Sequence, residues 1–142
     1  MILKGQLPSI NAELDKILTS AIDFKITLET DTTSNVMDVF IEDKEGKRVI
    51  ETASGMEKMI TSMALRVALT NLTSLPKSDI FILDEGFGSL DDTSLHQCLQ
   101  LMSLLKNYFR VILIITHIIP IKEIADKIIE INSDGSTSFV QV

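Results

Sequence analysis

Apolar residues near the start of the chain recur at the spacing of one helical face. They predict an amphipathic helix over residues 9–20, with Ser9 as its N-cap and one face packed on the domain. Further along, apolar and polar residues alternate, which is typical of half-buried strands. The expected segments are antiparallel strands at 24–28 and 37–41, a charged turn at 42–47 that uses Gly46, and a short third strand near Val49 and Ile50.

A helical period returns at Ser54, and the rest of the chain alternates between helical stripes and short apolar runs. The stripes predict helices from 54 to before Pro76, from about 93 to 106, and over 121–125. The runs predict strands at 79–83, 111–115, 128–131 and 138–142. The run at 111–115 is uninterrupted, as is usual for a strand buried on both faces of a parallel sheet. The pattern predicts an α/β fold: a mostly parallel sheet flanked by helices, with an antiparallel meander of strands near the N-terminus.

Composition narrows the class of protein. With 142 residues and 45% apolar content, residues 1–142 are expected to form one domain with a real core. The net charge of −7 argues against a surface whose main task is to neutralise nucleic-acid phosphates. Cys98 is the only cysteine, so no internal disulfide can form and a reducing cytoplasmic setting fits best. No apolar run approaches the roughly 20 residues of a membrane-spanning helix, so no membrane partner is expected.

Two adjacent carboxylates, Asp84 and Glu85, follow the apolar strand that ends at Leu83. Ligands of open α/β sheets bind at the carboxyl edge of the strands, so this position suits phosphoryl chemistry. Asp84 would hold Mg²⁺, usually through a water, and Glu85 would orient and deprotonate an attacking water. The alternative is that both residues only begin a solvated turn.

The run Ser54, Gly55, Met56 and Glu57 stands where a polar loop meets a helical stripe. A helix start presents free N–H groups and positive dipole, so an anion such as a terminal phosphate is a natural occupant, and the Ser54 hydroxyl can donate as well. The alternative is an N-cap serine with Glu57 closing a capping box. The two interpretations are compatible, because one serine can cap the helix and also face a phosphate.

Two further residues carry candidate chemistry. His117 follows the strand at 111–115 and could hydrogen-bond a γ-phosphate, although a lone histidine is more often an ordinary loop residue. Asp91 in Ser89-Leu90-Asp91 is an ordinary acid at a helix start unless another subunit faces it.

A phosphate-cradling Walker A loop is missing from this sequence. Such a loop needs glycine, four residues, then Gly-Lys-Ser/Thr. The only Gly-Lys here is Gly46-Lys47, which has Ile41 at the first glycine position and Arg48 after it. The chain by itself is therefore expected to be catalytically incomplete.

In this order the segments resemble the carboxyl-terminal half of an ABC-type ATPase head. Residues 54–57 look like the signature motif, 80–85 like Walker B, 89–91 like the D-loop, and His117 like the switch histidine. The run 84–91, Asp-Glu-Gly-Phe-Gly-Ser-Leu-Asp, is similar to that of the SbcC and Rad-fifty repair ATPases, relatives of the SMC proteins. The fold expected from this resemblance is the carboxyl-terminal lobe of an ABC/SMC-type P-loop NTPase head, at the base of a long coiled coil.

The resemblance implies a function. Two heads would sandwich ATP and Mg²⁺, with Ser54 and Gly55 acting across the head dimer on the γ-phosphate. Asp84 and Glu85 would act on the nucleotide of their own head. The implied partners are an amino-terminal Walker A lobe, a second head, an SbcD or Mre-eleven type nuclease, and DNA through the full complex. The setting would be cytoplasmic and nucleoid-associated, or nuclear in a eukaryote.

Some features depart from the family pattern. Ala53 stands where Leu or Cys is usual, and Met56 stands where a second glycine is common. The missing Walker A half leaves two expectations open: an excised carboxyl-terminal lobe, or a separate subunit that begins at Met1. Alternatives for function are another SMC-like or RecN-like chromosome-maintenance ATPase, and a non-catalytic dimerisation or regulatory module.

Overall fold

The computed structural model describes residues 2–19, 22–30, 36–74, 76–84, 92–133 and 135–141. Its elements, in chain order, are α1 Ile2–Leu18, β1 Lys25–Thr30, β2 Met37–Asp43, β3 Gly46–Val49, the 3-10 helix η1 Ile50–Thr52, α2 Gly55–Leu72, β4 Ile80–Asp84, α3 Asp92–Leu105, β5 Val111–Ile115, α4 Ile119–Glu123, β6 Glu130–Ser133 and β7 Ser138–Gln141. The predicted α/β class is confirmed. Among the described strands, the parallel part of the sheet structure is the β4–β5 pair, whereas β1–β2–β3 and β6–β7 are antiparallel.

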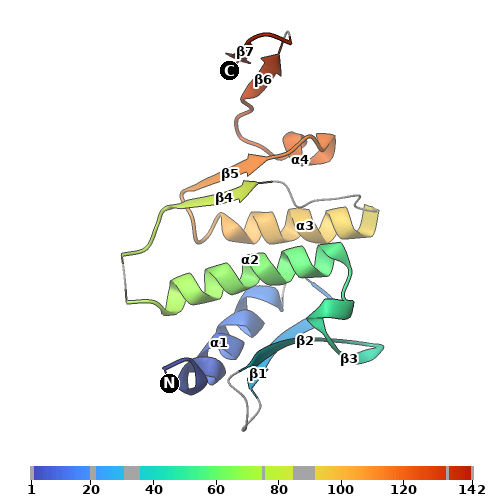
Figure 1. The fold of residues 1–142 in the computed structure, drawn as a ribbon, viewed down its shortest axis with the longest axis vertical. Helices are drawn as coiled ribbons and strands as arrows, with labels where there is room; N and C mark the ends of the chain where they lie inside the picture. Colours follow the sequence, from blue (N-terminus) through green and yellow to red (C-terminus); the bar gives the residue numbers. More distant parts are fainter. Residues whose placement is uncertain are drawn as a thin grey trace.

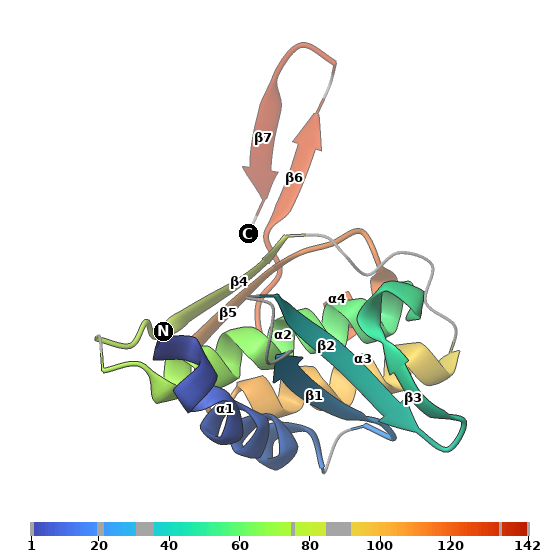
Figure 2. The ribbon, with the colours of Figure 1, turned by 60° about the horizontal axis from the view of Figure 1, so that its bottom comes forward.

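Helices α1, α2 and α3 lie between the β1–β2–β3 sheet and the β4–β5 pair (Figure 1). Helix α2 runs through the centre and packs between α1 and α3, while the β1–β3 sheet packs along α1. The β4–β5 pair lies on the side of α3 that faces away from α1 (Figure 1). The β6–β7 hairpin projects from the rest of the molecule (Figure 2). In the part of the chain that the structure describes, no helix has the length and apolar character needed to cross a membrane.

The predicted helical stripes form the core. Helix α2 buries the residues spaced for one face, and α1 and α3 bring matching stripes against it. These buried residues are Ile10, Leu14, Ile17 and Leu18 of α1, Ile60, Met63, Ala64, Val67 and Ala68 of α2, and Cys98, Leu101, Met102 and Leu105 of α3. The helical periodicity therefore predicts the packed faces of α1 and α2, whereas in α3 it missed the fully buried Leu101.

The predicted start of the first helix is wrong. Helix α1 begins at Ile2, so Ser9 lies inside it rather than at its N-cap, directly after Pro8. A proline inside a helix removes one backbone hydrogen bond, which favours a boundary there. Leu7 nevertheless packs against the core and extends the apolar stripe by about one turn before Ile10. This burial is the physical reason why the helix continues through the proline.

The prediction that the 111–115 strand is buried on both faces is also wrong. Helix α3 covers one face of the β4–β5 pair, and the other face is open. We call it the open sheet face; it consists of Ile80, Ile82, Val111, Leu113 and Ile115. Ile80 and Ile82 are each 52% exposed, so a sequence typical of a fully buried strand is only half covered here.

Smaller differences concern element ends. Strand β3 ends at Val49, and Ile50 already belongs to η1, which leads into α2. Gly46 has φ 125°, as expected for the turn between β2 and β3. Strand β6 begins at Glu130, later than predicted, because the backbone of Ile128 and Ile129 does not pair with β7.

Candidate functional site

The candidate residues that the structure describes lie at one side of the molecule. Strands β4 and β5 run parallel with Asp84 opposite Ile115, so their carboxyl ends meet at the same edge. The N-terminal end of α2, which carries Ser54 and Gly55, points to that same side in both Figure 1 and Figure 2. The topology thus brings the predicted signature, Walker B and switch segments to one side, as sheet-edge ligand sites require.

Asp84 and His117 are both open to solvent. Asp84 is the last residue of β4, and His117 stands two residues beyond β5. The Thr116 hydroxyl accepts the Ile118 N–H at 3.1 Å and shapes the loop that carries the histidine. Glu85 and Asp91 lie outside the described residues. Within the described ranges no three His, Cys, Asp or Glu side chains gather as metal ligands.

Ser54 is the N-cap of α2 and closes a capping box with Glu57. The Ser54 hydroxyl accepts the Glu57 N–H at 3.2 Å, and the Glu57 carboxylate accepts the Ser54 N–H at 2.7 Å. The Ser54 carbonyl accepts the Lys58 N–H at 3.1 Å, which is the first helical hydrogen bond. The capping interpretation of this segment is confirmed, and it fixes the Ser54 hydroxyl at the tip of the helix.

The same geometry fits an anion. In the capping box the Ser54 oxygen acts as an acceptor, so its own hydrogen is still available to donate. Among the described residues, no hydrogen bond engages the N–H groups of Gly55 and Met56, which stand at the positive end of the helix dipole. A Cβ added at Gly55 would meet nothing within 4 Å in this chain. Packing within this chain therefore does not require glycine at position 55. The missing side chain would favour a ligand that approaches the helix end from outside.

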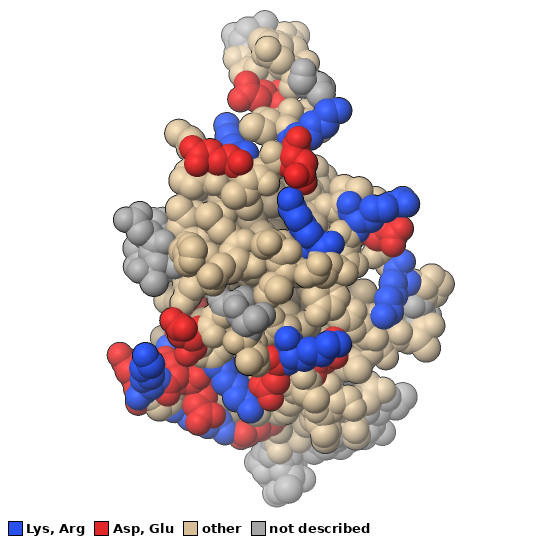
Figure 3. Space-filling view, turned by 180° about the vertical axis from the view of Figure 1, so that it is seen from behind, with Lys and Arg blue, Asp and Glu red and all other residues tan. Residues whose placement is uncertain are grey.

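Arg48 forms an ion-pair network that sequence reasoning missed. Its guanidinium Nη2 donates to Glu57 Oε1 and, at 2.9 Å, to Asp43 Oδ2, while Nη1 donates to Glu57 Oε2 at 3.3 Å. Figure 3 shows charged side chains gathered at its lower left, over the β2–β3 hairpin where this network lies. No periodicity signals such a contact, because it depends on how the hairpin folds back on α2.

The network alters the titration of its members. Partial burial of Glu57 raises its pKa, but hydrogen bonds from Arg48 and from the Ser54 backbone outweigh this effect and hold the pKa below its ordinary value. A hydrogen bond from Arg48 also lowers the pKa of Asp43, and the two carboxylates raise the pKa of Arg48. All three groups are therefore charged at neutral pH.

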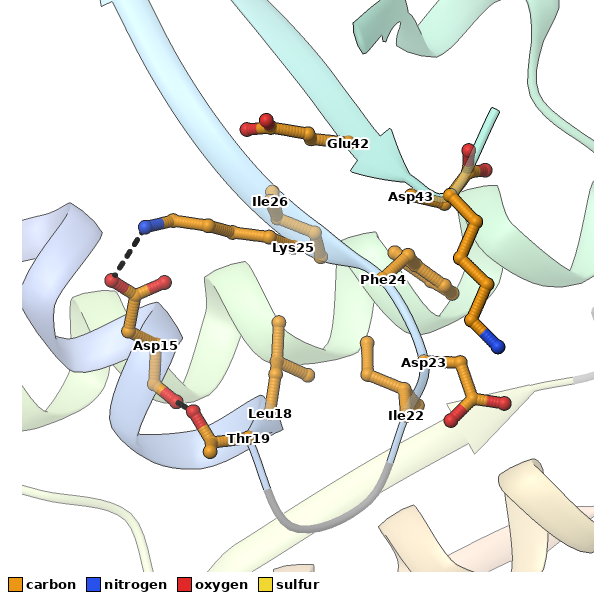
Figure 4. Close-up of a pocket in the computed structure, with 11 residues that line it drawn as sticks. Asp15, Leu18, Thr19, Ile22, Asp23, Phe24, Lys25, Ile26, Glu42 and Asp43 are labelled. Carbon is orange, nitrogen blue, oxygen red and sulfur yellow. Dashed lines mark hydrogen bonds and ion pairs between the residues drawn. The ribbon is translucent and has the colours of Figure 1, made fainter. Parts of the chain in front are cut away.

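A pocket of about 590 Å³ lies elsewhere, between the end of α1 and the strands β1 and β2 (Figure 4). Its walls carry acidic and basic side chains, and Asp15 pairs with Lys25 at 3.1 Å across one side. None of its lining residues is a predicted site residue. The candidate chemistry therefore lies at the surface formed by the helix and strand ends, and the pocket meets the Arg48 network at Asp43.

Comparison with known families identifies one match that covers more than half of the chain. Residues 20–103 match the family described as "SbcC/RAD50-like, Walker B motif". The matched segment includes α2, β4 and most of α3. It thus contains the signature-like and Walker B-like segments.

Similar proteins and structures agree with this family. The chain is 32% identical over 122 residues to the SbcC component of nuclease SbcCD from Clostridium acetobutylicum, covering 84% of this chain and 10% of that protein. It is 30% identical over 146 residues to uncharacterized protein R555 of Acanthamoeba polyphaga mimivirus, covering 92% of this chain and 11% of that protein. The chain therefore spans about a tenth of the length of these curated relatives.

The fold also matches a solved structure from a study of ATP-driven dimerization and DNA-stimulated activation of SMC ATPases. The TM-score is 0.78 at 20% identity, and the match covers 99% of this chain and 86% of that one. The expected SMC-type head fold is thereby confirmed.

Proposed function

The chain belongs to the SbcC/RAD50-like family of ATPase heads, and from this premise we propose that it is the carboxyl-terminal lobe of a DNA-repair ATPase head. In this proposal ATP and Mg²⁺ bind at the interface of two heads, and hydrolysis requires a Walker A lobe that this sequence does not contain. The observation that carries the proposal is the open N-terminal end of α2, where the Ser54 hydroxyl and the free N–H groups of Gly55 and Met56 can meet a phosphate.

The open sheet face supports the need for a second lobe. It presents five half-exposed apolar side chains on a pair of strands that, among the described elements, has no third strand beside it. Contiguous exposed apolar surface of this kind usually marks an interaction site. We propose that the Walker A lobe covers this face and extends the parallel sheet.

Each candidate residue has a distinct role in the proposal. Asp84 would hold Mg²⁺ at the end of β4, and Glu85 would take a proton from the attacking water. His117 would hydrogen-bond the γ-phosphate from the neighbouring strand. Ser54, Gly55 and Met56 would face the nucleotide of the other head, where Asp91 would also lie, and Glu57 would hold the helix start in place.

The named relatives favour a nuclease partner over other SMC functions. The Clostridium relative carries the name of a nuclease component, so we propose that this head works with an SbcD or Mre-eleven type nuclease in processing DNA ends. The alternatives are a RecN-like or other SMC-like ATPase without that partner, and a dimerisation module without turnover. Binding to a purified SbcD-type nuclease separates the first alternative from the proposal.

The direct test is steady-state ATP hydrolysis with Mg²⁺, measured for the chain alone and for the chain joined to a Walker A lobe. We expect activity only after joining. Glu85→Gln should reduce it by about 100- to 10,000-fold, the contribution of general-base catalysis. His117→Ala should reduce it by about 100-fold, as loss of a hydrogen bond to developing charge does.

His96→Ala is the matched control for the His117 variant. His96 lies exposed on α3, where its ring pairs with Gln100 at 3.1 Å, and it has no proposed role. Its substitution should leave turnover unchanged. A joined head that hydrolyses ATP equally well with Glu85→Gln would overturn the catalytic part of the proposal, and a silent joined head would favour the regulatory module.

A further inference from the structure

Arg48 links the β2–β3 hairpin to the first turn of α2. It stands on β3, holds Asp43 of β2 with one side of its guanidinium and reaches Glu57 of α2 with both terminal nitrogens. All three side chains are partly buried, with exposed fractions of 30% for Arg48, 20% for Asp43 and 16% for Glu57. A planar guanidinium that bridges two carboxylates in this way restrains both of them more firmly than a lysine could.

Through Glu57, the Arg48 ion pairs reach the N-terminal end of α2, which is the candidate phosphate-binding end. The same Glu57 carboxylate that accepts from Arg48 also accepts the Ser54 N–H at 2.7 Å. The Glu57 N–H in turn holds the Ser54 oxygen. Glu57 thus connects Arg48 to Ser54, and its contacts hold both the backbone and the side chain of the serine in place.

Charge gives the bridge a second effect. A carboxylate at the N-terminal end of a helix interacts well with the dipole, but it also repels an anion that would bind there. The Arg48 guanidinium, which is shared with Asp43, compensates part of the Glu57 charge at hydrogen-bond distance and leaves the capping box intact. The free N–H groups and the Ser54 hydroxyl can then meet a phosphate with less repulsion.

We propose that Arg48 is a positioning residue for phosphate recognition: it orients Glu57, which orients Ser54, and it partly compensates the charge of the Glu57 carboxylate at that helix end. This inference rests on the proposed function, in which Ser54 and Gly55 face the nucleotide of a second head. The alternative is that Arg48 only stabilises the hairpin. The two differ in whether Arg48 substitutions alter head engagement beyond their effect on folding.

The test uses the complete head, in which the chain is joined to the Walker A lobe. Arg48→Ala should weaken ATP-driven head dimerisation and lower kcat by about 10- to 100-fold, the range in which loss of a supporting contact falls. ATP affinity of the single head should change less than about twofold, because the proposal places the Walker A loop on the other lobe. Amide exchange should quicken at Ser54 and Glu57 in the same variant.

Lys47→Ala is the matched control. Lys47 is the neighbouring residue on β3, pairs with Glu29 and lies 4.4 Å from the centre of the Phe40 ring, with no contact to α2 among its described interactions. It should behave as wild type in dimerisation and turnover. Equal behaviour of Arg48→Ala and Lys47→Ala overturns the inference.

Two further variants keep the test decisive. Arg48→Lys retains the charge without the fork and should recover part of the activity, which also decides the matter if Arg48→Ala fails to fold. Adding Glu57→Gln to Arg48→Ala removes the uncompensated carboxylate and should restore part of the dimerisation. No recovery in either variant would overturn the positioning role.

The inference and the proposed function fail in different ways. A wild-type complete head without ATP-driven dimerisation overturns the proposed function and the role of Arg48 with it. A wild-type head that dimerises, beside an Arg48→Ala head that dimerises equally well, overturns the inference alone.

Discussion

The α1–α2–β1–β3 end of the molecule and the β4–β5 end treat their apolar residues in opposite ways. At the first end, the apolar faces of α1 and α2 pack against each other, and Arg48 forms ion pairs with Asp43 and Glu57 at the surface. At the second, α3 covers one face of β4–β5, while the open sheet face stays exposed. The first region is therefore stabilised by its own side chains, whereas the second leaves an apolar surface exposed, as the proposed second lobe would require.

The largest effect is expected in the α1–α2–β1–β3 end, which is stabilised by its own side chains. Ile60 on α2 is fully buried, so Ile60→Ala should lower the free energy of unfolding by about 2–5 kcal/mol through lost burial and the cavity left behind. Ile82→Ala on the open sheet face should cost about 0.5 kcal/mol or less. Urea unfolding followed by circular dichroism measures both. Equal costs would show that the open sheet face is buried in solution, and the comparison would be wrong.

The second prediction concerns association through the open sheet face. Ile82→Asp places a charge among the four remaining apolar side chains and should weaken the affinity for a separate Walker A lobe by about tenfold or more, which corresponds to about 1.4 kcal/mol. Any self-association of the chain alone should weaken as well. Sedimentation over a range of concentrations measures both. Ser103→Asp, which adds the same charge at an exposed position of α3, should have no effect.

The comparison also explains what the sequence could and could not predict. Helix faces and strand positions followed from local periodicity, as the buried stripe of α2 and the bounds of β5 show. The burial of β5 did not follow, because an apolar run reports the environment in the assembled sheet and cannot tell which neighbour supplies it. The helical stretch before Ser9 was missed because Leu7 packs across Pro8, a tertiary effect.

In the candidate site, too, the local features were predictable from the sequence and the tertiary contacts were not. The capping box at Ser54 and Glu57 was predictable, since its spacing is local and the geometry matches. The parallel pairing that sets Asp84 opposite Ile115, two residues before His117, was expected from the two apolar runs. The contact of Arg48 with Glu57 depends on a hairpin that folds back over nine residues of sequence, and no residue pattern announces it. The catalytic and nucleotide-binding roles of all the site residues, Glu85 and Asp91 included, remain predictions.

The third prediction separates folding from function at the start of α2. Ser54→Ala removes the N-cap and should cost about 1 kcal/mol of folding stability, within the range of about 0.5–2 kcal/mol for such caps. Gly55→Ala should leave stability within about 0.5 kcal/mol, because the added methyl meets nothing in this chain. In the joined head, however, Gly55→Ala should impair ATP-driven dimerisation. Full activity of that variant would argue against close approach of a phosphate at Gly55.

The fourth prediction uses pH. Since the pKa of Glu57 is lowered in the folded chain, its contribution to stability is complete above its ordinary pKa and is lost as pH falls through the folded-state value. Wild type should therefore lose more stability than Glu57→Gln between about pH 7 and about pH 3, where carboxylates become protonated. Urea midpoints at both pH values measure the difference. Parallel losses in the two proteins would show that Glu57 is not held by Arg48 in solution.

The fifth prediction concerns α3, which lies between the two regions. Cys98 on α3 is buried, and this burial raises its thiol pKa to about 11, so both access and thiolate content are low near neutral pH. Ellman's reagent should label it at least about 100-fold more slowly in native buffer than in urea. Because the chain has one cysteine, the signal has a single source. Labelling that stays slow in Ile82→Asp would show that the packing of α3 on the core does not depend on the open sheet face. Fast labelling would show that it does.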